Sequence, residues 1–222
     1  MRKLLAFDAI IFDMDGLLVD TESVWEEAES ALLSGYGIAL EAAVRAELIG
    51  LRNDVFIGKL KSMYGITESL EALQADVVGR MLKLIPVKAK PMPGALEMIQ
   101  YAVEQGIPTA IASSSPGIII EAVVSSQGWE KVIPVRCSAE HLLAGKPEPH
   151  VYLEAAKALD VAPMNCLALE DSPIGARAAV AAGMTCYAVP DLSHTRVEAF
   201  AGVTEHVFDT LHHVLERLTQ VA

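Results

Sequence analysis

The sequence predicts an α/β fold: a Rossmann-like parallel sheet with helices on both faces, and a small all-α cap domain inserted into it. After about residue 87, short apolar runs alternate with helix-like segments, which is typical of a parallel sheet covered by helices. Before that region, residues 22–86 show only helical periodicity. We therefore expect residues 1–21 and 87–222 to form the catalytic core and residues 22–86 to form the cap.

The first predicted strand, Ala9 to Phe12, is an uninterrupted apolar run that leads directly into Asp13. Such a run is expected of a strand that is buried on both faces. In the cap region, apolar residues recur at three- and four-residue intervals, enough for about four helices, one of them capped by Thr67. The region ends in the stretch 86–94, whose three prolines and glycine predict a linker.

The remainder of the core is expected to alternate between strands and helices. The predicted strands lie at 108–112, 132–137, 166–169 and 185–189, and the predicted helices at 95–105, 117–127, 150–159 and 174–182. A further edge strand is expected near 206–208, followed by a closing helix at 211–218.

Composition limits the partners of the chain. Its 222 residues are 52% hydrophobic, and its formal net charge of −12 argues against nucleic acid. An anionic substrate would therefore need a site made locally positive by a metal, a lysine or helix N-termini. We expect a cytoplasmic protein with no membrane contact and no obligate protein partner, because no apolar run could span a bilayer and Asp8 and Asp13 interrupt the N-terminal apolar stretch.

Polar residues follow four of the predicted strands. They are Asp13 with Asp15, Ser113, Lys146 in the next loop, and Glu170 with Asp171. Because parallel strands end at one edge of the sheet, all four groups are expected to meet there. Each has an alternative taken alone: an Asx-turn for the first pair, a helix cap for Ser113, an ordinary loop lysine, and an acidic pair that complements a helix dipole. None of these alternatives accounts for the set as a whole.

That set suits phosphoryl transfer with Mg²⁺. Asp13, a backbone carbonyl near Asp15, Asp171 and Glu170 are the predicted metal ligands, because Mg²⁺ takes hard oxygen ligands. Lys146 and the Ser113 hydroxyl would position the phosphate oxygens. Asp13 would be the nucleophile that forms an aspartyl phosphate, and Asp15 the general acid and base.

Four segments carry a resemblance to a known family: FDMDGLLVDTE (12–22), IASSSP (111–116), GKPEPHVY (145–152) and LEDSPIGARAAVAAGM (169–184). With these segments, in this order, the chain resembles the haloacid dehalogenase-like superfamily, in its branch of helical-cap sugar phosphatases and beta-phosphoglucomutase-like proteins. The resemblance implies the roles given above, Mg²⁺ as cofactor, a small phosphorylated metabolite as substrate, and a cap that closes over the site. DTExxW also resembles phosphatases of 2-deoxyglucose 6-phosphate and hexitol phosphates.

Two residues bear on the reaction within this branch. Asp15 argues against a dehalogenase, which lacks an aspartate two positions after the nucleophile. Trp25 stands where the hexose phosphomutase has a histidine, and this favours hydrolysis, although Trp25 could equally be a core anchor. We therefore expect a Mg²⁺-dependent phosphatase acting on small phosphomonoesters, in particular sugar phosphates, with a beta-phosphoglucomutase-like enzyme as the alternative.

The expected substrate-binding residues are Ser114 in the core and Gly50, Arg52, Asn53 and Trp25 in the cap. Arg52 and Asn53 could bind a sugar or a second anionic group, while Gly50 lets the backbone approach closely; the same turn could instead be a plain joint between helices.

Two non-catalytic functions are also considered. A phospho-aspartate signalling module would hold the phosphoryl group for long periods, but its acidic pair precedes the phosphoacceptor, the reverse of the order here. The retention of every chemical group argues against a catalytically silent sugar-phosphate-binding protein, and turnover separates the two.

Overall fold

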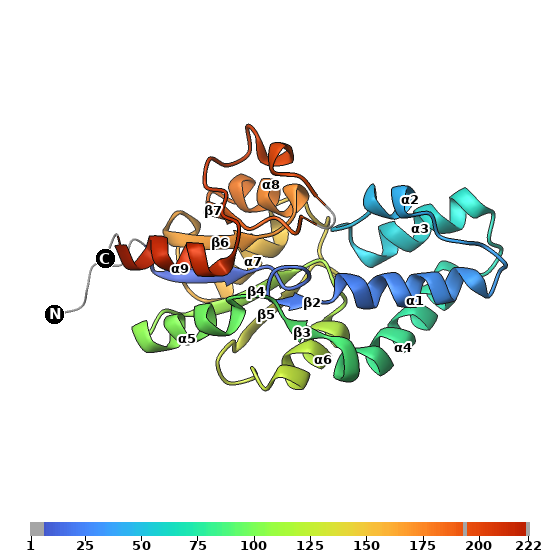
Figure 1. Ribbon diagram of the computed structural model, residues 1–222, viewed down its shortest axis with the longest axis horizontal. Helices are drawn as coiled ribbons and strands as arrows, with labels where there is room; N and C mark the ends of the chain where they lie inside the picture. Colours follow the sequence, from blue (N-terminus) through green and yellow to red (C-terminus); the bar gives the residue numbers. More distant parts are fainter. Residues whose placement is uncertain (1–6, 193–194, 221–222) are drawn as a thin grey trace.

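The computed structural model describes residues 7–192 and 195–220 (Figure 1). Its centre is a five-stranded sheet in the order β5-β4-β1-β6-β7, in which all neighbouring strands are parallel. The strands are β1 (Ala9–Phe12), β4 (Thr109–Ser113), β5 (Val135–Ser138), β6 (Cys166–Glu170) and β7 (Thr185–Ala188). The predicted fold class is confirmed, and β1 lies at the middle of the sheet.

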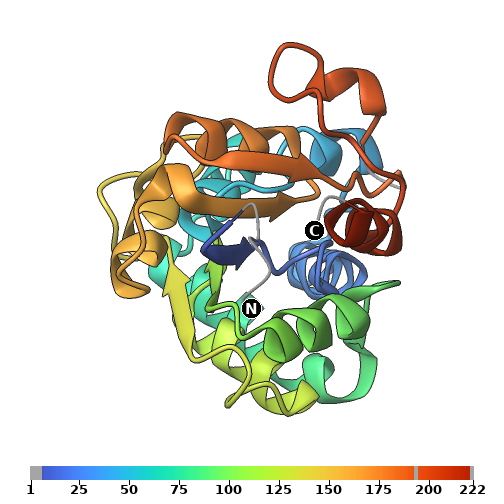
Figure 2. The same cartoon turned by 90° about the vertical axis from the view of Figure 1, so that its left-hand side faces the viewer.

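The alternation of side chains along β1 separates two hydrophobic clusters. Ile10 and Phe12 belong to the cluster that includes residues of α5 (Ala95–Gln105), α6 (Gly117–Gln127) and α9 (Leu211–Gln220). Ala9 and Ile11 belong to the cluster formed with α7 (His150–Ala158) and α8 (Pro173–Ala181). Since successive side chains of a strand point to opposite faces, the sheet is covered by helices on both sides, as Figure 2 shows.

The inserted all-helical cap consists of α1 (Glu22–Ser34), α2 (Ala42–Ala46), α3 (Asn53–Tyr64) and α4 (Leu70–Lys88). In Figure 1 these helices lie at one end of the molecule, beyond the carboxyl ends of the strands. The two chain segments that join cap and core pair with each other: β2 (Val19–Asp20) is antiparallel to β3 (Lys90–Pro91). This small ribbon was not predicted from the sequence.

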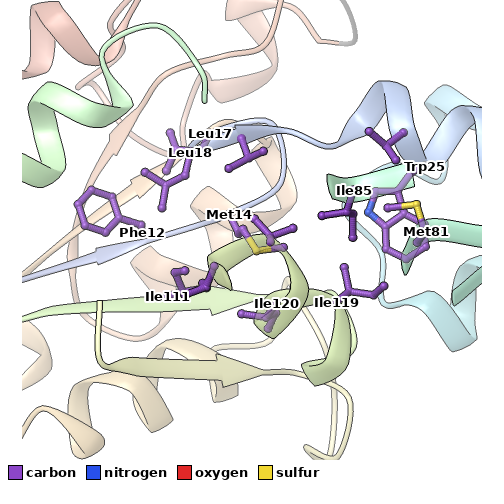
Figure 3. Close-up of a cluster of buried hydrophobic side chains, with 14 of the residues drawn as sticks. Phe12, Met14, Leu17, Leu18, Trp25, Met81, Ile85, Ile111, Ile119 and Ile120 are labelled. Atoms are coloured by element: carbon purple, nitrogen blue, oxygen red, sulfur yellow. The ribbon is translucent and has the colours of Figure 1, made fainter. Parts of the chain in front are cut away.

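The hydrophobic core continues from the sheet into the cap (Figure 3). Phe12, Leu18 and Ile111 on the core side belong to the same buried cluster as Trp25 of α1 and Ile85 of α4. Burying side chains of this size stabilises a fold by about 1.5–3 kcal/mol each. The junction is therefore packed tightly around the end of β1, where the predicted catalytic aspartates lie.

Several element boundaries differ from the sequence-based expectation. Ser69, rather than Thr67, caps α4, because its Oγ accepts a hydrogen bond of 3.1 Å from the N–H of Ala72. Helix α4, which packs against α1 and α6, runs through Pro86 to Lys88, so the expected linker begins later. The position of the boundary between the domains stays a prediction, and residues 1–6 of the expected core lie outside the described residues.

Two strand predictions need correction. The run at 132–137 forms a strand only from Val135 onward, after a turn at Trp129 to Ile133. The expected edge strand near 206–208 is a single bridge between Val207 and Ala188. Two short 3-10 helices, η1 (Pro163–Asn165) and η2 (Val197–Phe200), complete the described elements. None of the helices in residues 7–192 and 195–220 has the length and apolar character needed to cross a membrane.

Candidate active site

The register of the sheet brings residues that are far apart in the sequence to one edge. Phe12 of β1 is paired with Leu169 of β6, and the Asp13 N–H donates a hydrogen bond of 2.9 Å to the carbonyl of Leu169. Asp13 and Glu170, the next residue on each strand, therefore lie beside each other. The predicted convergence of polar groups at the carboxyl edge is observed.

Lys146 joins two of these carboxylates. Its Nζ donates hydrogen bonds to Asp13 Oδ1 at 2.7 Å and to Glu170 Oε1 at 2.5 Å. The hydroxyl of Tyr152 donates to the same Glu170 oxygen at 2.6 Å. Only 2% of the Lys146 side chain is exposed, so water screens these ion pairs very little. Lys146 thus fixes the position of the Asp13 carboxylate from one side.

A buried cluster of three carboxylates lies at the same edge. Asp13, Glu170 and Asp171 each offer an oxygen, and these oxygens lie within 4.8 Å of one another. Asp171 Oδ1 is buried and has no hydrogen-bond partner among the residues that the structure describes. Burial and the neighbouring carboxylates raise the pKa of Asp13 to about 7, although Lys146 opposes the rise, and they raise the pKa of Asp171 well above its usual range.

This cluster fits a divalent cation. The donors are hard carboxylate oxygens, and the Asp171 oxygen that lacks a hydrogen-bond partner could bind a cation. A cation would also offset the negative charge that burial makes costly. The Asp15 carboxylate lies outside the cluster, so the expectation that Asp15 contributes a ligand concerns its backbone carbonyl and stays a prediction.

The Asp15 carboxylate is held where the cap meets the core. Its Oδ1 accepts hydrogen bonds from Thr21 Oγ1 at 2.6 Å and from the indole Nε1 of Trp25 at 3.3 Å. Its Oδ2 accepts from Ser113 Oγ at 2.9 Å and from Ser115 Oγ at 2.8 Å. In this arrangement the hydroxyl of Ser113, which is fully buried, contacts Asp15; its expected role on the phosphate stays a prediction.

A cavity that is partly open to solvent lies between cap and core. Small-molecule sites occur preferentially at such interfaces between domains. The predicted residues Asp13, Asp15, Lys146 and Asp171 line it, together with Trp25, Gly50, Asn53 and Ser114. The backbone at Gly50 has a φ of +82°, a conformation that other residues rarely adopt.

Arg52 is not among the residues that line this cavity. Its guanidinium forms a bidentate ion pair with Asp54, with distances of 2.7 and 2.8 Å, and its Nη1 donates to the carbonyls of Ala139 and Leu142 in the core. Ser114 Oγ adds a hydrogen bond of 3.1 Å to the carbonyl of Gly50. Arg52 thus links cap and core here, and its expected role in binding substrate stays a prediction.

A model of the haloacid dehalogenase-like hydrolase family matches residues 7–183, which is most of the chain. The chain belongs to the haloacid dehalogenase-like hydrolases. Hexitol phosphatase B of Escherichia coli (strain K12) is 35% identical over 186 residues, which cover 82% of this chain and 83% of that protein. The phosphorylated carbohydrates phosphatase of Thermotoga maritima is 29% identical over 177 residues, which cover 80% of this chain and 82% of that protein.

The solved structures include a close match in fold. The crystal structure of CbbY from Rhodobacter sphaeroides in complex with phosphate superposes with a TM-score of 0.84 at 26% identity, covering 94% of this chain and 96% of that one. The family expected from the sequence is confirmed, and so is the enzyme class, a phosphoric monoester hydrolase.

The sequence analysis missed three charged residues in the cap part of this hydrolase's cavity. Glu22, Glu29 and Arg45 line the cavity, and each is less than a tenth exposed. The two glutamates could have been found from the sequence. Glu22, Trp25 and Glu29 are spaced by three and four residues, which places them on one face of α1. Two carboxylates on the buried face of an amphipathic helix indicate a role beyond packing.

Proposed function

We propose that this hydrolase is a Mg²⁺-dependent phosphatase that cleaves small sugar phosphates through an aspartyl-phosphate intermediate. The observation that carries the proposal is the position of Asp13: its carboxylate lines the cavity, is bonded to Lys146, and belongs to the buried acidic cluster. Two further carboxylates beside an aspartate repel its charge, so this arrangement would destabilise an aspartate with a purely structural role. The named activities of the two relatives, on hexitol phosphates and phosphorylated carbohydrates, support the substrate class.

In the first proposed step, Asp13 attacks phosphorus. A bond forms between its carboxylate oxygen and phosphorus, and the bond from phosphorus to the alcohol oxygen breaks. The leaving oxygen takes a proton from Asp15, which must exchange one of its present hydrogen bonds for this contact. Lys146 and the hydroxyls of Ser113 and Ser114 are the proposed phosphate-positioning groups.

In the second step, the oxygen of a water molecule attacks phosphorus and forms a bond to it, and the water gives one proton to Asp15. The bond between Asp13 and phosphorus breaks, and inorganic phosphate leaves. Asp15 thus returns to its starting state as an acid. Asp13, Asp171 and Glu170, with the Asp15 carbonyl, are the proposed ligands of Mg²⁺, which when bound supplies the positive charge that the cluster and the phosphate require.

Phosphate release from a panel of sugar phosphates, with Mg²⁺ or with EDTA, tests the proposal. We expect turnover that needs Mg²⁺, and none for Asp13→Asn. Asp160→Asn serves as the matched control, because Asp160 is an exposed residue with a φ of +56° that asparagine tolerates.

The alternatives give distinct results in the same assay. Conversion of glucose 1-phosphate into glucose 6-phosphate faster than phosphate release would identify a phosphomutase. A stable phosphoprotein without turnover would identify a signalling module, and binding without any chemistry a silent sugar-phosphate-binding protein.

A further inference from the structure

Tyr152 is a buried tyrosine that the proposed function leaves without a role. It lies in the first turn of α7, shortly after Lys146 in the same segment, and its side chain is fully buried. It belongs to the hydrophobic cluster that contains Ile11 of β1 and Ala168 of β6. The ring of a phenylalanine would fill the same space, whereas a buried hydroxyl is costly unless it is hydrogen-bonded. The hydroxyl of Tyr152 therefore indicates a polar role in addition to packing.

The Glu170 carboxylate is the partner of this hydroxyl, and it is held through both of its oxygens. Its Oε1 accepts hydrogen bonds from the Tyr152 hydroxyl at 2.6 Å and from Lys146 Nζ at 2.5 Å. Its Oε2 accepts from the N–H of Ser172 at 3.2 Å and from the Ser172 Oγ at 3.1 Å. Ser172 is in turn the N-cap of α8. Helices α7 and α8 thus fix the orientation of the Glu170 carboxylate through one oxygen each.

Tyr152 also contacts Lys146 directly. The Lys146 Nζ lies over the Tyr152 ring, 5.1 Å from its centroid, which is within the range of a cation–π interaction. An oxygen of a carboxylate has two lone-pair positions. At Glu170 Oε1 the hydroxyl takes one of them and Lys146 takes the other, from which Nζ also reaches Asp13 Oδ1 at 2.7 Å. Without the hydroxyl both positions are open to Nζ, and its distance to Asp13 is no longer fixed.

The exact position of Lys146 Nζ matters for the chemistry. An ammonium group has three N–H donors. In the part of the chain that the structure describes, Asp13 and Glu170 accept two of these hydrogen bonds, and Lys146 lines the cavity, so the third can be directed at a phosphate oxygen. A displacement of a catalytic group by about 1 Å can lower a rate by up to about 100-fold.

We propose that Tyr152 is a positioning residue for phosphoryl transfer: its hydroxyl fixes the Glu170 carboxylate, and Glu170 in turn holds Lys146 at Asp13. Among the described residues, those that line the cavity do not include Tyr152, so it acts through Glu170 and Lys146 rather than on the substrate. This inference rests on the proposed function, because it concerns the lysine that positions the phosphate at the same site.

Tyr152→Phe tests the inference, because it removes one oxygen and keeps the ring beneath Lys146. We expect kcat/KM for the best sugar phosphate to fall about tenfold, as for other groups that orient a catalytic side chain. The loss should lie in kcat, with KM within about threefold of the wild type, because the residues that line the cavity are unchanged. A kcat equal to that of the wild type, or a loss confined to KM, would overturn the inference.

Two substrates with different leaving groups sharpen the kinetic test. Lys146 is expected to contact the phosphoryl group, which a sugar phosphate and p-nitrophenyl phosphate have in common. The fall in kcat/KM on Tyr152→Phe should therefore be of similar size for both substrates. A fall with the sugar phosphate alone would place the effect at the leaving group and would contradict the proposed route through Lys146.

Tyr187→Phe is the matched control. Tyr187 of β7 is also buried, but it belongs to the hydrophobic cluster on the other face of the sheet, where its ring contacts Phe7 and Phe208. This variant also loses one hydroxyl from a buried ring, and we expect it to keep the kcat of the wild type. An equal loss of kcat in both variants would show that the effect of Tyr152→Phe comes from packing, and the inference would fail.

Crystal structures of the wild type and of Tyr152→Phe, both grown without Mg²⁺, give a readout that does not depend on turnover. We expect the distance from Lys146 Nζ to Asp13 Oδ1 to increase from 2.7 Å to beyond about 3.5 Å, where no hydrogen bond remains. A lysine that keeps its wild-type position in the variant would overturn the inference, whatever the kinetics.

The structural and kinetic measurements together separate this inference from the proposed function. A displaced Lys146 in Tyr152→Phe, with no hydrolysis of any phosphate ester by the wild type, would retain Tyr152 as the residue that positions Lys146 and would reject the phosphatase. Hydrolysis by the wild type, with kcat and the Lys146 position both unchanged in the variant, would retain the phosphatase and reject the role of Tyr152.

Discussion

Replacing Glu29 by glutamine should change how the stability of the protein depends on pH. Burial raises the pKa of Glu29 from 4.5 to about 7, with Glu22 and Glu26 adding to the rise and Arg45 opposing it. The folded state therefore holds a proton on Glu29 at pH values where the unfolded chain has released it. The stability from this proton is present at low pH and is lost as the pH rises towards 7.

The size of the effect follows from the same change in pKa. At about 1.4 kcal/mol per pH unit, the rise corresponds to roughly 3 kcal/mol, of which about 2.5 kcal/mol falls between pH 5 and pH 8. Glutamine does not titrate. The free energy of unfolding of Glu29→Gln, relative to the wild type, should therefore increase by roughly 2–3 kcal/mol from pH 5 to pH 8.

Urea denaturation of both proteins at pH 5 and pH 8, with the same excess of Mg²⁺, measures this difference. Contributions from the acidic cluster are common to both proteins and cancel in the comparison. Glu216→Gln, at an exposed site on α9, should follow the wild type at both pH values. A constant difference between Glu29→Gln and the wild type, or one that shrinks as the pH rises, would refute the reasoning.

Three further changes have defined outcomes. Gly175→Ala should lower kcat/KM by about 10–100-fold, because a Cβ there would overlap the Glu170 carboxylate; a wild-type value would contradict this placement. Asp171→Asn should raise the Mg²⁺ concentration for half-maximal activity about 10–100-fold in a metal titration, and an unchanged titration would exclude Asp171 as a ligand. Arg52→Ala removes two of the hydrogen bonds between cap and core, so we expect KM to rise about tenfold and limited proteolysis of the cap to become faster. Arg80→Ala, in an exposed pair within α4, is the control.

The sheet and its acidic edge could be predicted because they depend on local rules. The apolar run at Ala9 to Phe12 is β1 with its predicted bounds. Once the sheet is parallel, the strand ends must share one edge, so the meeting of Asp13, Glu170 and Asp171 follows from topology alone. Lys146, in the loop before α7, reaches the same edge.

The cap was harder to read from sequence because its polar contacts are tertiary. The contacts of Arg52 with Asp54 and with two core carbonyls could not be predicted from the sequence, and its expected role at the substrate stays a prediction. Arg45 meets Glu29 across 16 positions of sequence, a pairing that helical periodicity alone does not specify. For Trp25 the sequence allowed two interpretations, a core anchor or a functional residue. In the structure it is buried in the hydrophobic cluster and also donates a hydrogen bond to Asp15.

The short ribbon of β2 and β3 has a consequence for how such enzymes diversify. Val19 faces Pro91 and Asp20 faces Lys90, so the chain leaves the sheet and returns to it at neighbouring points. The length of the segment inserted between β2 and β3 therefore does not affect the register of β1 in the sheet. A different insert could be grafted at this pair of residues while the sheet keeps its catalytic edge, provided that the graft supplies a donor for Asp15 in place of Trp25. The sheet and the insert can therefore change independently of each other.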